Sequence, residues 1–208
     1  MPKTVAVLSA CLILGFSAVN VHAQSQAPNA QPAATWQPIT PQQRGLWLVQ
    51  SIVGAQLAGE VVSSAWSTAF NNPHEYGPTW KGFGKRYGVG IAGIAIGNTI
   101  EAGVGSLWGE DPRYFRSPSG TPFGKRVKQV IKFSFDTHYE DGSVHFAYAR
   151  LTGNVSNNFI SNIYRPPSEN DWQHALVRVG EGYLGKMAGN AFREFWPDVR
   201  KRMSHKKD

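Results

Sequence analysis

The stretch YGVGIAGIAIGNTIEAGVG at residues 87–105 decides how the chain is interpreted, because it contains the spacing Gly88-x-Gly90-x-x-Gly93. That spacing is the fingerprint of a dinucleotide-binding turn, which requires an apolar strand directly before it. The preceding residues, WKGFGKRY at 80–87, do not form such a strand pattern. The sequence therefore predicts no cofactor loop here, and we expect no cofactor.

The same glycines fit a helix over residues 79–109. Small residues recur along it at helical spacing: Gly88, Ala92, Ala95, Thr99, Ala102 and Ser106. Each glycine costs about 1 kcal/mol of helix propensity relative to alanine, which close contact between helices offsets. Asn98 and Glu101 interrupt the apolar stretch, which is then shorter than the roughly 20 residues that cross a bilayer. We predict a close-packing helix, with shallow membrane insertion or an oligomer contact as the alternatives.

Further helices are predicted over residues 41–70, 123–132, 151–164 and 171–195, with Pro197 stopping or kinking the last. The first has a polar stripe of Gln56, Glu60, Ser63 and Ser67, which favours an amphipathic helix over a lipid-surrounded span. Its apolar residues are expected to be covered: Trp47, Val49, Ile52, Val53, Leu57, Val61, Ala65 and Trp66. The last carries Gly182, Gly185 and Gly189, and two glycine-striped helices most simply pack on each other.

A β-hairpin is predicted within FSFDTHYEDGSVHFAYAR, residues 133–150, because polar and apolar residues alternate on both sides of Asp141-Gly142. A helix is the alternative. With that pair at the turn, His138 lies opposite His145 and Asp136 lies diagonal to His145. Two imidazoles and a carboxylate in reach of one ion make these three residues the metal or acid–base candidates. The competing interpretation is that they are exposed polar residues on a hydrated face, and we expect no bound metal.

Two blocks set acid, proline, aromatic and arginine residues side by side, EDPRYFR at 110–116 and EFWPDVR at 194–200. Such clusters can bind a phosphate or a carbohydrate through arginines and aromatic faces, or they can be structural corners. In the first block Asp111 is predicted to cap a single helical turn that ends at Arg116. Asp111, Arg113 and Arg116 are the candidate catalytic residues of this block. No HExxH, GxSxG or phosphate-loop motif occurs in the chain.

The N-terminal residues have the pattern of an export signal. Residues 1–23 contain one early cation, Lys3, then an apolar run and small or apolar residues before position 24, so we expect cleavage there. Leu8-Ser9-Ala10-Cys11 has the residue types of a lipoprotein site, which makes lipidation of Cys11 the alternative. Because Cys11 is the only cysteine, we expect neither a disulfide nor a thiol nucleophile in the mature chain.

Composition divides the rest of the chain and indicates its partners. Residues 24–39, rich in Gln, Pro and Ala, predict a disordered linker, residues 40–200 one mainly helical domain, and residues 201–208 a basic tail. The formal net charge is +7, which falls by one when Lys3 is removed, and it suits an envelope membrane surface or anionic lipid. We expect no nucleic acid partner, because export separates the chain from it, and we regard a homo-oligomer as a further candidate.

A set of blocks resembles a group of exported, uncharacterised bacterial proteins. The blocks are EYGPTWKGFGKRYG, LWGEDPRYFR, TPFGKRVKQVIKFSF, NNFISNIYRPPSE and NAFREFWPDVR, and the group shares DPRYFR, SN-x-Y-x-PP and EFWPD-like sequences. The similarity covers about residues 47–200. It implies one exported domain, and it implies no catalytic residue because the group carries no assigned activity.

The sequence as a whole predicts a mainly α single domain of glycine-rich packed helices with one small β-hairpin. We expect an exported, non-enzymatic envelope protein, periplasmic or peripheral to the outer or inner membrane, that supports membrane-peripheral packing or self-association. The alternative is a small periplasmic hydrolase or lipid-modifying enzyme that uses Asp111, Arg113 and Arg116 with the hairpin histidines.

Overall fold

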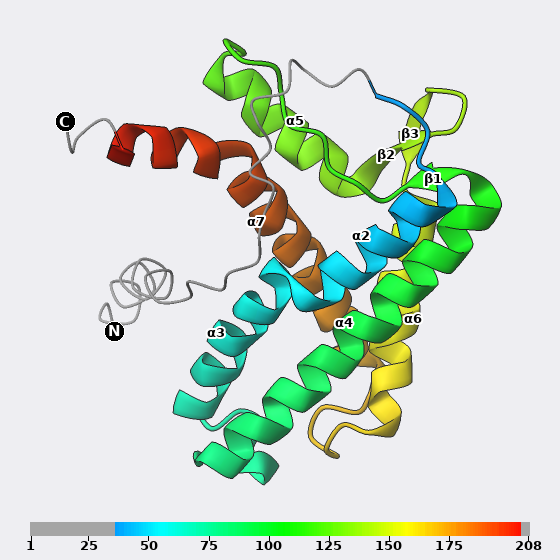
Figure 1. The fold of residues 1–208 in the computed structure, drawn as a ribbon. Helices are drawn as coiled ribbons and strands as arrows, with labels where there is room; N and C mark the ends of the chain where they lie inside the picture. Colours follow the sequence, from blue (N-terminus) through cyan, green and yellow to red (C-terminus); the bar gives the residue numbers. More distant parts are fainter. Residues whose placement is uncertain (1–35, 205–208) are drawn as a thin grey trace. The chain divides into compact units, whose positions relative to one another are not determined.

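The computed structural model describes residues 36–204 (Figure 1). It is mainly helical, with one small three-stranded antiparallel sheet, which confirms the predicted fold class. The predicted signal peptide with Cys11, the linker before Trp36 and the end of the basic tail lie outside the described residues.

The first predicted helix is in fact two helices, α2 (Pro41–Val53) and α3 (Ala55–Ala69). α2 begins with a capping box: the Gln43 backbone N–H donates to the Thr40 hydroxyl, and the Thr40 N–H donates to the Gln43 side chain. The break lies at Gly54, where φ is −95° and ψ is −137°. A Cβ atom there would lie 2.4 Å from the Gln50 carbonyl oxygen, so glycine is required.

α4 (Trp80–Trp108) lies within one residue of its predicted bounds at each end and packs against α2 and α3. Its main partner is α6 (Tyr148–Ile160), where the backbones approach closely (Figure 1). A Cβ atom added to Gly153 would lie 2.5 Å from the carbonyl oxygen of Gly97. The prediction that α4 packs chiefly on the last helix is therefore wrong, because α6 takes that place.

The last helix, α7 (Trp172–Ser204), packs on α6 and on α5 (Phe123–Phe135). Gly182 faces Asn154 of α6, and a Cβ atom there would lie 2.5 Å from the Asn154 side-chain oxygen. The helix continues through Pro197, so its predicted end near residue 195 is wrong.

The sheet has the order β1 (Glu110–Asp111), β2 (Asp136–Tyr139), β3 (Val144–Phe146). The hairpin is confirmed, but its predicted register is wrong by one residue: Thr137 pairs with His145 and His138 with Val144. The Tyr139 N–H donates to the Ser143 carbonyl, which leaves a three-residue loop that ends in Gly142 at φ 83°. The predicted helical turn at residues 111–116 is also wrong, since β1 occupies its start.

Polar residues, rather than apolar ones, fill the contact between α2, α3 and α4. The Asn98 amide donates to the Ser51 hydroxyl at 3.0 Å and to the Gln56 side chain at 2.8 Å, and Ser64 donates to Glu60 at 2.8 Å. The apolar residues point outward instead. Of those expected to be covered, Trp47 is buried, whereas Val49, Val53, Val61 and Trp66 are exposed. The expectation that these apolar residues are covered is therefore wrong for Val49, Val53, Val61 and Trp66, while Trp47 is buried and Ile52 and Leu57 are partly buried.

Candidate functional site

The two acid–proline–aromatic–arginine blocks meet around Glu194 of α7, which is fully buried. Its carboxylate accepts from Arg126 Nε at 2.7 Å, the Tyr114 hydroxyl at 2.9 Å and the Ser117 N–H at 3.1 Å. Burial alone would raise the pKa of Glu194, but these hydrogen bonds outweigh it and hold the pKa below its ordinary value. The same hydroxyl contact and burial raise the pKa of Tyr114.

Asp198, one turn further along α7, joins the same cluster. It accepts from Arg116 and, at 2.6 Å, from Arg126 Nη1, and these partners lower its pKa. Arg116 also donates to the Glu194 carbonyl oxygen at 2.9 Å. The guanidinium groups of Arg116 and Arg126 thus donate their hydrogen bonds to Glu194 and Asp198 of the same chain. This arrangement supports the structural-corner interpretation of the two blocks over phosphate or carbohydrate binding. We call Tyr114, Arg116, Ser117, Arg126, Glu194 and Asp198 the ionic corner.

Asp111, the acid of the first block, forms a separate ion pair. Its carboxylate is almost fully buried and accepts hydrogen bonds from Arg113 Nε at 2.9 Å and from Arg113 Nη2 at 2.6 Å. The Arg113 N–H also donates to it at 3.0 Å, which fixes the turn after β1. Arg113 in addition donates to the Gln37 carbonyl at 2.9 Å. The pair therefore ties β1 to the chain that leads into α2.

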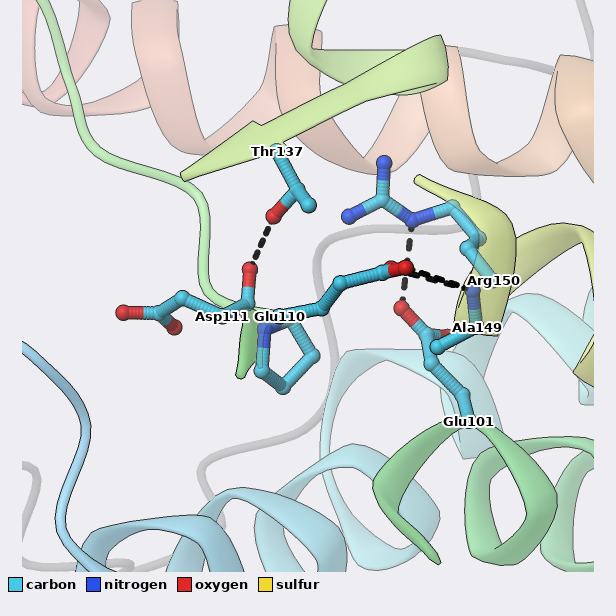
Figure 2. Close-up of a pocket in the computed structure, with 7 residues that line it drawn as sticks. Glu101, Glu110, Asp111, Thr137, Ala149 and Arg150 are labelled. Carbon is cyan, nitrogen blue, oxygen red and sulfur yellow. Dashed lines mark hydrogen bonds and ion pairs between the residues drawn. The ribbon is translucent and has the colours of Figure 1, made fainter. Parts of the chain in front are cut away.

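A second buried acid cluster lies between α4, β1 and α6 (Figure 2). Glu110 accepts from the Ala149 N–H at 3.0 Å and from the Tyr139 hydroxyl at 3.0 Å, and Glu101 accepts from Arg150 Nε at 3.1 Å. Figure 2 shows Glu110, Glu101 and Arg150 directed toward one another, while the Asp111 carboxylate points away. Burial raises the pKa of Glu110, and the hydrogen bonds from Ala149 and Tyr139 and the charge of Arg150 offset this effect only in part. The surrounding pocket is filled by side chains and leaves no room for a water molecule.

The metal and acid–base candidates of the hairpin are not brought together. The His138 ring is stacked on Trp36 and Phe133, with centroids 5.3 and 5.1 Å away, whereas His145 is exposed on the opposite face of the hairpin. Asp136 shares the face of His138, and both are partly buried. Burial lowers the pKa of His138, as expected of a packed aromatic residue. Within residues 36–204 no cluster of three or more His, Cys, Asp or Glu residues could hold a metal ion.

The catalytic candidates are divided among three places. Asp111 pairs with Arg113 and lies opposite His138 in the β1–β2 register, Arg116 lies in the ionic corner, and His145 lies on the exposed face of β3. Asp111 lines the filled pocket of Figure 2, and the other candidates do not. Among the described residues, this pocket therefore does not bring the candidates together.

A groove that the sequence did not indicate lies between α2 and the last turns of α4. It has a volume of about 420 Å³ and is lined by Ile39, Pro41, Arg44, Gly45, Leu48, Thr99, Ala102, Gly103, Ser106 and Glu140. Arg44 is 8% exposed, and its Nη2 donates to the Glu110 carbonyl oxygen at 2.8 Å. Its Nη1 has no hydrogen-bond partner within the described part of the chain. One feature of the sequence could have drawn attention to this groove: Arg44 stands alone in an uncharged stretch, since the next charged residue along the chain is Glu60.

Two helical segments among the described residues have the length and composition of membrane spans, Pro41–Ala69 and Trp80–Trp108. Core helices of water-soluble proteins can meet the same criterion, but such helices are mostly buried. Here only 12% and 28% of the respective apolar windows are buried. Asn98 and Glu101, which interrupt the apolar stretch of α4, lie inside the molecule with hydrogen-bond partners. Their presence therefore does not argue against a span, contrary to the sequence-based expectation.

Comparison with known proteins adds no relative. No family model, curated protein or solved structure matches the chain. The resemblance to exported bacterial proteins remains a prediction, and function must be argued from the geometry.

Proposed function

We propose that the protein is a non-enzymatic, exported protein of the cell envelope whose α2, α3 and α4 helices lie in a membrane. The observation that carries this proposal is the inverted polarity of these helices. Their hydrogen-bonding residues face one another, as Asn98 does toward Ser51 and Gln56, and their large apolar residues face outward. That arrangement is unfavourable in water and favourable in lipid, where apolar surroundings replace the missing outer layer.

The energetic argument concerns the outward residues. Val49, Val53 and Val61 are 57%, 61% and 44% exposed, and Leu107 is 82% exposed. Moving one such side chain completely out of water stabilises a protein by about 1.5–3 kcal/mol. Contact with lipid tails would therefore stabilise the folded protein at each of these exposed positions. A single exposed valine needs no explanation, but the recurrence of exposed valines along α2 and α3 does.

Charged residues in these helices follow the rule for membrane interiors. Between residues 45 and 68 the one charged residue is Glu60, and between residues 87 and 109 it is Glu101. Both face inward and both have partners: Ser64 donates to Glu60, and Arg150 pairs with Glu101. Ionisable groups within membrane segments are tolerated when they face the protein interior and are paired.

Aromatic residues mark both ends of the proposed lipid-facing layer. Trp66, Phe70 and Trp80 lie exposed around the α3–α4 connection, and Trp108 and Tyr148 lie exposed together at the other end of α4. Amphipathic aromatic rings are enriched at the two membrane–water interfaces. The positions of these residues therefore support a layer that α4 crosses from end to end.

The alternative hydrolase or lipid-modifying enzyme has less support. Of the five candidates only Asp111 lines the filled pocket, Asp111 and Arg113 pair with each other, and Arg116 pairs with Asp198 in the ionic corner. A second copy of the chain could cover the same apolar face in place of lipid. The experiment below distinguishes these two cases.

The test is fractionation of the full chain followed by a carbonate wash and liposome flotation. We expect the wild-type protein to stay with the membrane pellet and to float with liposomes. The double variant Val53→Lys, Val61→Lys should be released, because lysine is costly at the centre of a lipid-facing helix. Met203→Lys, a similarly exposed apolar residue at the end of α7, is the matched control and should behave as wild type. A wild-type protein that is wholly soluble, or that forms oligomers without floating, contradicts the proposal.

A further inference from the structure

We propose that α5 lies in the plane of an anionic phospholipid surface, with Lys125, Lys128 and Lys132 on lipid phosphates and Ile131 among the first carbons of the acyl chains. This inference rests on the proposed membrane location, which would bring lipid to α5. It goes beyond that location by assigning the lipid class and the helix that selects it.

The outward face of α5 combines positive charge with apolar area. Lys125, Lys128 and Lys132 recur at i, i+3 and i+7, which places them on one side of the helix, and all three are exposed. Ile131 lies beside them and is 49% exposed, whereas Val130 on the inner side is buried. An exposed apolar side chain among lysines is typical of a helix that lies in a membrane interface.

The three lysines are available to bind an anion. Within residues 36–204 none of them forms an ion pair with a carboxylate, and the Lys132 ammonium group lies 5.8 Å from the centre of the Phe133 ring. On the inner side of α5, Glu194 and Asp198 already accept from the arginines of the ionic corner. Asp136, which follows the helix, is partly buried. Lipid phosphates therefore complement three exposed charges that no ion pair of the described residues neutralises.

The end of α7 extends this basic surface beside the start of α5. Arg126 of α5 pairs with Asp198 of α7, which holds the last turns of α7 next to α5. Arg200, Lys201 and Arg202 follow on α7 and are all exposed. Clusters of about four to eight lysines and arginines on amphipathic helices bind anionic lipid surfaces.

The sheet holds α5 at the level of the lipid head groups if α4 crosses the lipid layer. β1 begins two residues after α4 ends, β2 begins directly after α5 ends, and the two strands pair. Figure 1 shows α5 and the sheet at the end of α4 that leads into β1. The same end carries the exposed Trp108 and Tyr148, and such aromatic residues are enriched at the membrane–water interface. Because the head-group layer is hydrated, the ionic corner beside α5 stays in contact with water in this arrangement.

The experiment is native mass spectrometry of the full chain, released from detergent that contains equal amounts of phosphatidylglycerol and phosphatidylcholine. We expect wild type to retain phosphatidylglycerol in preference, because only this lipid has a net negative charge. Lys125→Gln, Lys128→Gln should lower the ratio of the two retained lipids about fivefold for each lysine, the loss expected when one cation leaves an anionic lipid surface. Lys81→Gln, Lys85→Gln is the matched control: it removes the same charge from two exposed lysines at the start of α4 and should leave the ratio close to that of wild type.

A further variant separates a lipid surface from a dissolved polyanion. Ile131→Gln keeps every charge but removes an apolar side chain from the acyl layer, so it should reduce the retained phosphatidylglycerol about fivefold. Unchanged retention would mean that the lysines bind phosphate through charge alone, as they would bind any polyanion, and would contradict the in-plane contact with lipid.

Equal retention of the two lipids by wild type would overturn the inference. The same loss of preference in both lysine pairs would also overturn it, because the preference would then follow net charge and not α5. If wild type floats with liposomes but shows no lipid preference, the role of α5 fails and the membrane location stands. If wild type does not float at all, the membrane location itself fails.

Discussion

The helices α2–α4 and the ionic corner both have polar interiors, but they use different chemistry. Asn98, Ser51 and Gln56 join the helices through neutral groups, whereas Glu194, Asp198 and Arg126 join α5 and α7 through full charges. Exposed valines lie on the outside of the first region, and the second includes partly exposed charged residues, Arg116 and Asp198. Under the proposed membrane location, the helices would face lipid and the corner would face water. The predictions below test that division.

Removal of the Glu194 carboxylate should have the largest effect. Glu194→Ala leaves the Arg126 guanidinium and the Tyr114 hydroxyl without their main acceptor, and breaking such a buried pair costs about 3–5 kcal/mol. Thermal and chemical denaturation in detergent would measure the loss. Glu181→Gln, an exposed position on the same helix, should change stability little. A Glu194→Ala protein as stable as wild type would show that the corner is dispensable.

Substitution of a glycine in the contact between α4 and α6 should lower stability by a smaller amount. The effect should depend on whether the glycine faces the other helix. Gly153→Ala places a methyl group 2.5 Å from the Gly97 carbonyl oxygen and should cost about 1–3 kcal/mol. Gly84→Ala meets no atom within 4 Å and should stabilise the protein by about 0.5–1 kcal/mol through helix propensity. The same denaturation assay compares them. Equal effects would mean that close packing of the two helices is not what selects glycine.

The smallest effect should be a difference in pH dependence between two buried carboxylates. The pKa of Glu194 is lowered in the folded protein, so its stabilisation is present above its unfolded pKa, about 4.3, and is lost as the pH falls through the folded value. The pKa of Glu110 is raised, so its stabilisation is present below about 4.3 and is lost as the pH rises through the folded value.

Glu110→Gln removes that titration and keeps an acceptor for Ala149. We expect its stability relative to wild type to improve as the pH rises from about 4 to 7, the interval above the unfolded pKa. Denaturation midpoints of both proteins across this interval would measure the trend. A constant difference would show that Glu110 does not titrate differently in the folded state.

Several elements of the fold could be predicted from the sequence because their signals are local. Helical spacing and terminal glycine gave α4 nearly to its ends, and Asp141-Gly142 gave the hairpin. The register was missed because a three-residue loop ending in Gly142 shifts every pair by one. That shift separates His138 from His145 and removes the predicted metal candidates.

The orientation of the first helix could not be predicted for a more general reason. Periodicity identifies two faces of a helix, but which face is inside depends on the surrounding solvent. The polar stripe predicted an amphipathic helix, and within it Gln56 accepts from Asn98 of α4 and Glu60 lies against Gly90 of α4. The ionic corner was missed in the same way: Arg126 lies among lysines in α5, and nothing local indicates a partner such as Glu194 far along the chain.

The contacts of Glu194 have a consequence for synthesis. They join it to Tyr114 and Arg126, which precede it by 80 and 68 positions, so they form only after residue 194 has been made. Until then, Tyr114, Arg126 and the Ser117 N–H lack the carboxylate that they share. The loop after β1 and the start of α5 therefore acquire their common acceptor late, from a helix made long after them.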